Sequence, residues 1–244
     1  MTIDGIGIAV LLIIFFSTLV RTVFGFGNAL VAMPLLAMTG LGMKTVTPLV
    51  ALISLVLGGV ILAMDWKKVE IRSAWRLLLA TVPGIPLGTM FLKGDYEKIG
   101  VIFLALIIIG FSSYSLYKPK LIELKAEWPA YPFGFLAGIL GGAYNSNGPP
   151  VVIYGTLRTW GPEEFRATLQ GYFLPSSVII VAGHGMGGLW NADVWKYFLL
   201  SLPVTLFTIW FGNRMQRLIP PGHFDKWIHA TLILVGILLL IKTI

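Results

Sequence analysis

The sequence predicts an all-α fold: a polytopic membrane helix bundle of two inverted repeats, each with about five membrane segments and discontinuous helices at the pseudo-symmetric centre. Three observations predict it, namely an apolar composition, a series of long apolar runs and an internal duplication. Hydrophobic residues make up 57% of the 244 positions and charged residues 12%, with a mean hydropathy of +0.85. Soluble domains carry about 25% charged residues, so lipid is the solvent that suits this surface.

Long apolar runs give the first set of predicted elements. Each has about the 17 to 25 residues that cross a hydrocarbon core. They cover residues 3–20, 45–64, 74–92, 98–117, 166–187, 195–212 and 226–242. The first run has no basic n-region and no small-residue cleavage site, so we expect a retained helix and not a removed signal peptide.

Two further apolar regions, 25–41 and 131–157, are broken by Gly, Asn and Pro. Backbone groups that are freed at such breaks must be satisfied by protein or water, because lipid offers no partner. We therefore expect short or discontinuous helices that are packed inside the bundle.

The chain repeats itself in three places, in the same order in both halves. The matching pairs are 75–83 with 195–203 (WRLLLATVP and WKYFLLSLP), 96–98 with 224–226 (YEK and FDK), and 25–34 with 141–150. The sequence therefore predicts a duplication. The predicted parts are an N-terminal membrane repeat at 1–117, a cytoplasmic linker at 118–130 and a C-terminal membrane repeat at 131–244.

Positive charge predicts how the two repeats are oriented. If region 25–41 and segments 131–145 and 148–157 each cross the membrane, 13 of the 18 Lys and Arg residues lie on one side. If the broken regions instead enter and return as re-entrant hairpins, the count is nine on each side. The positive-inside rule favours the first arrangement, with five crossings per half and both termini outside. An odd number of crossings inverts the second half, which is typical of secondary transporters.

The breaks are the predicted substrate site. We expect a helix to restart near Pro149 and Pro150, with its positive dipole end and free N–H groups facing a cavity that attracts anions. The expected substrate-binding residues are Gly27, Asn28, Pro34, Tyr144, Asn145, Ser146, Asn147, Gly148, Pro149 and Gln170. In the alternative reading, the glycines only allow tight helix packing and the polar groups cap helix ends.

Other polar residues near the breaks have two readings each. Gln170, Phe173 and Ser177 share one helix face, so Gln170 either lines the pathway or bonds a neighbouring helix. The basic residues beside the breaks are mainly orientation signals, although one or two of them can guide an anion into the cavity. These are Arg21, Lys44, Arg158 and Arg166.

Several functions are disfavoured by what the sequence lacks. With no cysteine, a disulfide framework, a thiolate metal site and a cysteine nucleophile are excluded. There is no nucleotide-binding or hydrolase motif, so we expect no enzyme activity, no cofactor and no metal. The net charge of +7 falls in short gaps between apolar runs, which predicts membrane orientation and no binding to nucleic acid.

Glycine-rich turns that lead into Pro and an apolar run occur twice, in GFGNALVAMPLL and GILGGAYNSNGPPVVIYG. Together with the later Pro-containing stretches TVPGIPLG and SLPVTLFT, they resemble the TauE/SafE family of sulfite/sulfonate exporters over about residues 5–242. The family pattern is richer in consecutive glycines than either copy here. The resemblance implies a multi-pass protein of a bacterial or archaeal inner membrane that moves sulfite, sulfoacetate or related small anions.

The expected function is therefore secondary-active transport of small anions, such as sulfite or organosulfonates, by alternating access. The expected direction is export. The alternatives are a channel-like anion facilitator and, with less support, a membrane scaffold or enzyme. The expected partners are a small anionic solute, a coupling ion (H+ or Na+), the lipid bilayer and a second copy of the chain in a homodimer.

Overall fold

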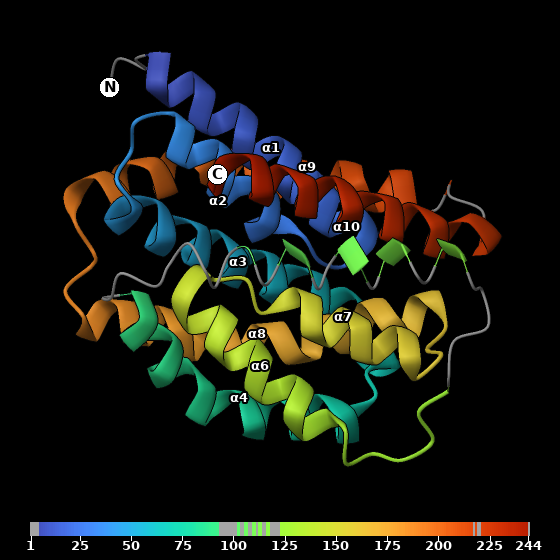
Figure 1. Ribbon diagram of the computed structural model, residues 1–244. Helices are drawn as coiled ribbons and strands as arrows, with labels where there is room; N and C mark the ends of the chain where they lie inside the picture. Colours follow the sequence, from blue (N-terminus) through green and yellow to red (C-terminus); the bar gives the residue numbers. More distant parts are fainter. Residues whose placement is uncertain are drawn as a thin grey trace.

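The computed structural model describes residues 5–92, 123–216, 218 and 221–243, together with scattered positions between 102 and 117. Every element identified in these ranges is helical (Figure 1), as predicted. The helices are α1 (Gly5–Phe24), α2 (Asn28–Met38), α3 (Met43–Asp65), α4 (Ile71–Leu92), α6 (Ala130–Tyr144), α7 (Gly148–Leu157), α8 (Pro162–Met186), α9 (Ala192–Gln216) and α10 (Pro221–Thr243), with a 3-10 turn at Trp66–Lys68.

Each predicted run that falls in the described residues corresponds to a helix, with ends displaced by a few residues. Three helical stretches are long and apolar enough to cross a membrane: Gly5–Phe24, Lys44–Met64 and Ala192–Gln216. The predicted run 98–117 and the motif at 96–98 lie wholly or mostly outside the described residues.

The two broken regions form helical hairpins whose tips lie inside the bundle. Gly25 and Gly27 have φ values of 87° and 97°, which glycine adopts without steric cost, and they turn the chain from α1 into α2. In the second hairpin α6 ends at Asn145, at φ 52°, and prolines at the first positions of α7 start the next helix, as predicted. The segment that leads into α6 lies beside the end of α7, where the Leu124 N–H donates to the Leu157 carbonyl over 2.8 Å.

Helices α3 and α8 pack against each other at the centre and run antiparallel. Gly58 of α3 lies against Leu174, whereas Val69, just beyond α3, lies against the earlier Gly171. Because α3 directly follows α2 and α8 directly follows α7, antiparallel packing sends α2 and α7 from the centre toward opposite ends of the molecule (Figure 1).

Two parallel helix pairs flank this centre. In the α4–α6 pair, Gly134 faces the Leu77 carbonyl and Gly142 faces the Ile85 carbonyl. In the α1–α9 pair, Gly212 lies against Thr22, one turn from the end of each helix. The first helix of each half therefore packs against the fourth helix of the other half.

Candidate functional site

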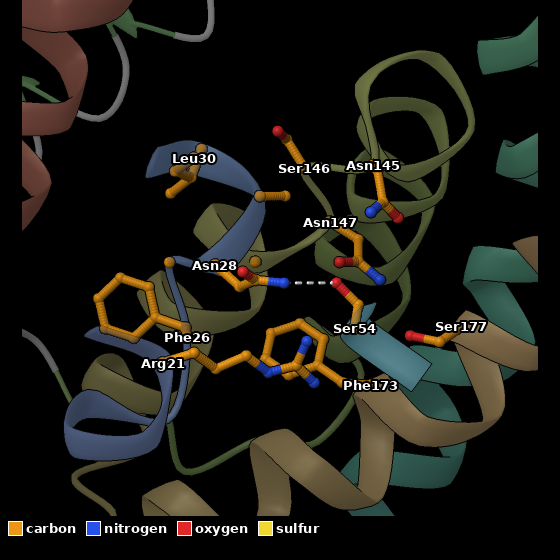
Figure 2. A pocket seen from close by; sticks show the side chains of 13 residues that line it. Arg21, Phe26, Asn28, Leu30, Ser54, Asn145, Ser146, Asn147, Phe173 and Ser177 are labelled. Carbon is orange, nitrogen blue, oxygen red and sulfur yellow. Dashed lines mark hydrogen bonds between the residues drawn. The ribbon is translucent and has the colours of Figure 1, made fainter. Parts of the chain in front are cut away.

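The tips of the two hairpins meet at an enclosed polar cavity of about 20 Å³ (Figure 2). A space of that size holds about one water molecule. Its walls come from the α1–α2 tip, the α6–α7 tip, α3 and α8. The lining residues are Arg21, Phe26, Gly27, Asn28, Ala29, Leu30, Ser54, Asn145, Ser146, Asn147, Gly148, Phe173 and Ser177.

Arg21 is the charged residue of this cavity. It lies near the end of α1, is only 4% exposed, and its guanidinium stacks 4.9 Å from the centre of the Phe173 ring. Its Nε atom has no hydrogen-bond partner. Within the part of the chain that the structure describes, no acidic side chain pairs with Arg21, and the buried charged residues are Arg21 and Arg166. A positive charge is thus held in the protein interior without a carboxylate.

One glutamine holds both Arg21 and the tip of its hairpin. Arg21 Nη2 donates to Gln170 Oε1 over 2.9 Å, and Gln170 Nε2 donates to the Gly25 carbonyl over 2.6 Å. Gln170 is fully buried on α8 and lies behind Arg21, outside the cavity wall. Of the two roles that the sequence allowed for Gln170, the structure shows a hydrogen bond to a neighbouring element.

An asparagine–serine pair marks each hairpin tip. Asn28 Nδ2 donates to Ser54 Oγ over 2.9 Å, as Figure 2 shows, and Asn147 Nδ2 donates to Ser176 Oγ over 3.0 Å. Each pair ties the first turn of a short helix to the long helix that follows it. Two amide atoms in the cavity wall have no partner, Asn28 Oδ1 and Asn145 Nδ2. Buried polar atoms are normally bonded, so these atoms are available to a bound group or to water.

A second polar network supports the α6–α7 tip from outside the cavity. The Tyr172 hydroxyl lies 2.9 Å from Thr81 Oγ1 and also interacts with the side chains of Asn147 and Ser176. Thr81 Oγ1 in turn lies 2.8 Å from the Gly134 carbonyl of α6. The α6–α7 tip is therefore linked to the α4–α6 pair, whereas the α1–α2 tip is linked to α8 through Gln170.

The predicted site residues fall into three groups. Six line the cavity, and they are Gly27, Asn28, Asn145, Ser146, Asn147 and Gly148. Pro149 is buried in the first turn of α7 and, like Gln170, is not part of the wall. The side chains of Pro34 and Tyr144 lie outside what the structure describes.

The predicted substrate-binding set did not include seven residues that the structure adds to the wall. They are Arg21, Phe26, Ala29, Leu30, Ser54, Phe173 and Ser177. The available signal was the shared helix face of Gln170, Phe173 and Ser177, which correctly groups residues that lie near the cavity.

The four basic residues beside the breaks differ in burial. Arg21 and Arg166 are each only 4% exposed, and Arg166 donates to Asn213 Oδ1. Lys44 is exposed and Arg158 is partly exposed; Arg158 Nη1 donates to the Leu124 carbonyl over 2.8 Å. Arg21 alone among the four lines the cavity.

Comparisons with known proteins agree with this architecture. The family model described as sulfite exporter TauE/SafE matches residues 10–239. The chain is 24% identical over 235 residues to the probable sulfite/organosulfonate exporter TauE of Cupriavidus necator. This alignment covers 93% of this chain and 91% of that protein. The chain is 26% identical over 169 residues to the probable inner membrane transporter protein TsaS of Comamonas testosteroni, which covers 67% and 71% respectively. No solved structure matches the chain. The chain therefore belongs to the sulfite exporter TauE/SafE family, which confirms the predicted membrane transporter class and inner-membrane location.

Proposed function

We propose that this protein is a secondary-active transporter of small sulfur-containing anions, of the sulfite or organosulfonate class, that works by alternating access. The observation that carries the proposal is Arg21, a buried guanidinium in the wall of a central cavity, beside which the described residues place no carboxylate. One relative is named a probable sulfite/organosulfonate exporter, and the other a probable inner membrane transporter protein.

The charge of Arg21 favours an anion in the cavity. An uncompensated charge in a low-dielectric interior is costly, and charged residues inside membrane proteins usually mark a solute pathway. A bound anion supplies the missing negative charge and can accept a hydrogen bond from the free Nε of Arg21. Asn145 Nδ2, which also lacks a partner, is a second donor for the same group.

The two helix starts favour an anion in the same place. Asn28 and Gly148 begin α2 and α7, and both line the cavity. The start of an α-helix carries free N–H groups and about half a positive charge. Two such ends beside Arg21 make an electropositive centre at the meeting point of two discontinuous helices, where inverted-repeat transporters bind their solutes.

The reciprocal packing supports two inverted repeats, 1–117 and 131–244, joined by the linker 118–130. A twofold axis in the membrane plane makes the central pair antiparallel and requires matched outer pairs, and α3–α8, α4–α6 and α1–α9 have this arrangement. Two halves of opposite orientation can open a central site to either side in turn.

The size of the cavity favours a carrier over a channel-like facilitator. A cavity with room for about one water molecule is not a wide open pore, which supports a carrier whose solute enters in a more open conformation. A channel needs a continuous pathway in a single conformation.

The test is transport of radiolabelled sulfite and of anionic organosulfonates by proteoliposomes that contain the full chain. We expect Arg21→Gln to lower the initial rate by about 100-fold, because removal of a buried charge partner costs about 3 kcal/mol. Arg21→Lys should retain part of the rate. The matched control is Arg214→Gln, which removes an exposed arginine outside the cavity.

Two outcomes would contradict the proposal. Normal transport by Arg21→Gln at normal protein yield would remove Arg21 from the site. Flux that never exceeds equilibration under an imposed proton or sodium gradient would favour the facilitator.

A further inference from the structure

Two hollows open on the apolar outer surface of the bundle, and they differ in the charge at their edges. The first, of about 340 Å³, lies between α3, α4 and α8. We call it the tryptophan groove, since Trp66 and Trp75 form part of its wall together with Leu62, Leu78, Gly171 and Pro175. The second, of about 540 Å³, lies between α1 and α9 and has a fully apolar wall.

Two cations stand at the edge of the tryptophan groove. Lys67 Nζ lies 5.8 Å from the centre of the Trp66 ring. Arg72 is exposed and follows Ile71 of the groove wall, three residues before Trp75. Within the described part of the chain, neither cation takes part in an ion pair.

The other charged groups nearby already have partners. Lys68 pairs with Glu163 over 3.0 Å, and Arg76 pairs with Glu127. The Glu70 carboxylate accepts the Ser73 N–H over 2.7 Å at the start of α4. Among the described side chains at this edge, the cations without an ionic partner are therefore Lys67 and Arg72.

The floor of the groove offers a polar atom at membrane depth. Pro175 has no N–H, so it cannot give the Gly171 carbonyl its usual helix hydrogen bond. Both residues line the groove. A carbonyl that loses this bond needs another donor when it faces hydrocarbon, and a hydroxyl of a bound molecule can supply one.

We propose that the tryptophan groove binds an anionic phospholipid with a hydroxylated headgroup, such as phosphatidylglycerol. An acyl chain lies along the apolar wall, and the phosphate lies at the edge near Lys67 and Arg72. The tryptophans suit this position, because Trp is enriched where hydrocarbon meets headgroups. The positive-inside rule places this end of the bundle on the cytoplasmic side, where basic pockets between helices bind anionic lipids.

The charge pattern distinguishes this occupant from other candidates. A free phosphate would use the two cations but not an apolar hollow of about 340 Å³. A neutral lipid would fill the hollow but would leave the cations without a partner. Only an anionic lipid uses both.

The test is native mass spectrometry of the full chain in non-ionic detergent, with equal amounts of dioleoyl-phosphatidylglycerol and dioleoyl-phosphatidylcholine. We expect preferential retention of phosphatidylglycerol by the wild type. The double variant Lys67→Ala/Arg72→Ala should lose about 25-fold in phosphatidylglycerol binding, since each cation near a headgroup contributes about fivefold. Its phosphatidylcholine binding should not change.

The matched control is Lys44→Ala/Lys196→Ala, which removes two cations from the opposite end of the bundle. Lys196 Nζ lies 5.1 Å from the centre of the Tyr197 ring, so it resembles Lys67 over Trp66 without an adjoining groove. Equal losses in the two double variants would overturn the proposal. Leu78→Trp, which fills the groove and keeps both cations, should also reduce phosphatidylglycerol retention.

Three further results would overturn the proposal: no preference for phosphatidylglycerol over phosphatidylcholine, competition by soluble glycerol phosphate, and a dimer that excludes lipid and is lost on Leu78→Trp. The absence of a preference would mean that the cations do not select the lipid. Competition would mean that the site binds a free anion, and such a dimer would mean that a second copy of the chain covers the groove. None of these results bears on Arg21, so failure here leaves the proposed transport function intact.

Discussion

The α4–α6 and α1–α9 pairs occupy equivalent places in the bundle but are built from different residues. Between α4 and α6 the contacts are glycine against backbone: a Cβ on Gly138 would clash with the Thr81 carbonyl oxygen, and one on Gly88 would clash with that of Ile139. On α1 and α9, by contrast, six buried serine and threonine residues carry hydroxyl groups. They are Ser17, Thr18 and Thr22 on α1 and Ser201, Thr205 and Thr208 on α9.

This difference indicates how firmly each pair is held. Glycines let two backbones approach closely, and an interface without side chains has few alternative arrangements. In the α1–α9 pair the hydroxyls of Thr18, Ser201 and Thr205 have no hydrogen-bond partner. Such an interface can rearrange at little cost, because other arrangements can satisfy these groups. We expect α1, which carries Arg21, to move more readily than α6.

The largest expected effect is that of Gly138→Ala. The new methyl group meets a backbone carbonyl and not a flexible side chain, so the helices must separate. We expect a loss of at least about 3 kcal/mol, or about 10 °C in unfolding temperature, measured by thermal unfolding in detergent. Gly183→Ala is the control, because a Cβ on Gly183 would meet nothing within 4 Å. Equal stability of the two variants would show that α4 and α6 are not held by backbone contact.

The next effect is that of Thr81→Val, which removes the hydroxyl beside Tyr172 and the Gly134 carbonyl. We expect a loss of about 1 to 2 kcal/mol, because two buried polar groups lose a partner. The measurement is again the unfolding temperature, and Thr81→Ser, which keeps the hydroxyl, should lie close to wild type. If Thr81→Ser is as unstable as Thr81→Val, the methyl group and not the hydroxyl matters.

A smaller effect is expected for Gly212→Ala in the α1–α9 pair. The added Cβ would lie 2.8 Å from Thr22 Cγ2, a side-chain atom that can move, so we expect a loss of about 1 kcal/mol. The double variant Thr22→Ser/Gly212→Ala lacks this methyl group but keeps the Thr22 Cβ at 2.9 Å, so it should recover part of the loss. A deficit that persists undiminished in the double variant would mean that backbone contact limits this pair as well.

The smallest effect, and of opposite sign, is expected for Thr205→Val. The replacement has nearly the same shape and removes a buried hydroxyl that has no partner, so stability should be unchanged or higher by up to about 1 kcal/mol. Thr205→Ser keeps the hydroxyl and serves as the control. Marked destabilisation by valine would mean that the hydroxyl is bonded after all, and the contrast between the two interfaces would weaken.

Local patterns predicted the helices and their breaks because each signal lies within a few residues. Gly25, Gly27, Asn145 and Pro149 mark the tips through backbone preferences that any context preserves. The glycines at 134, 138 and 142 also show the small-residue spacing of a close helix pair, a signal that can be read in the sequence but did not enter the prediction.

The role of Arg21 needed the tertiary structure. In sequence, an arginine at the end of an apolar run is typical of an orientation signal, and nothing local separates it from Arg158. Its partner Gln170 is 149 residues away. For the same reason the sequence could suggest that Gln170 lines the pathway, but it could not predict that Gln170 lies behind Arg21.

The Gln170 side-chain amide binds both Arg21 and the Gly25 carbonyl. It therefore couples the position of the charge in the cavity to the backbone of the α1–α2 tip. A bound anion that moves the Arg21 guanidinium into the cavity must either lengthen the hydrogen bond between Arg21 and Gln170 or move Gln170 as well. Movement of Gln170 displaces the Gly25 carbonyl. Occupancy can thus be transmitted as a mechanical signal to the hairpin without any group that changes its protonation.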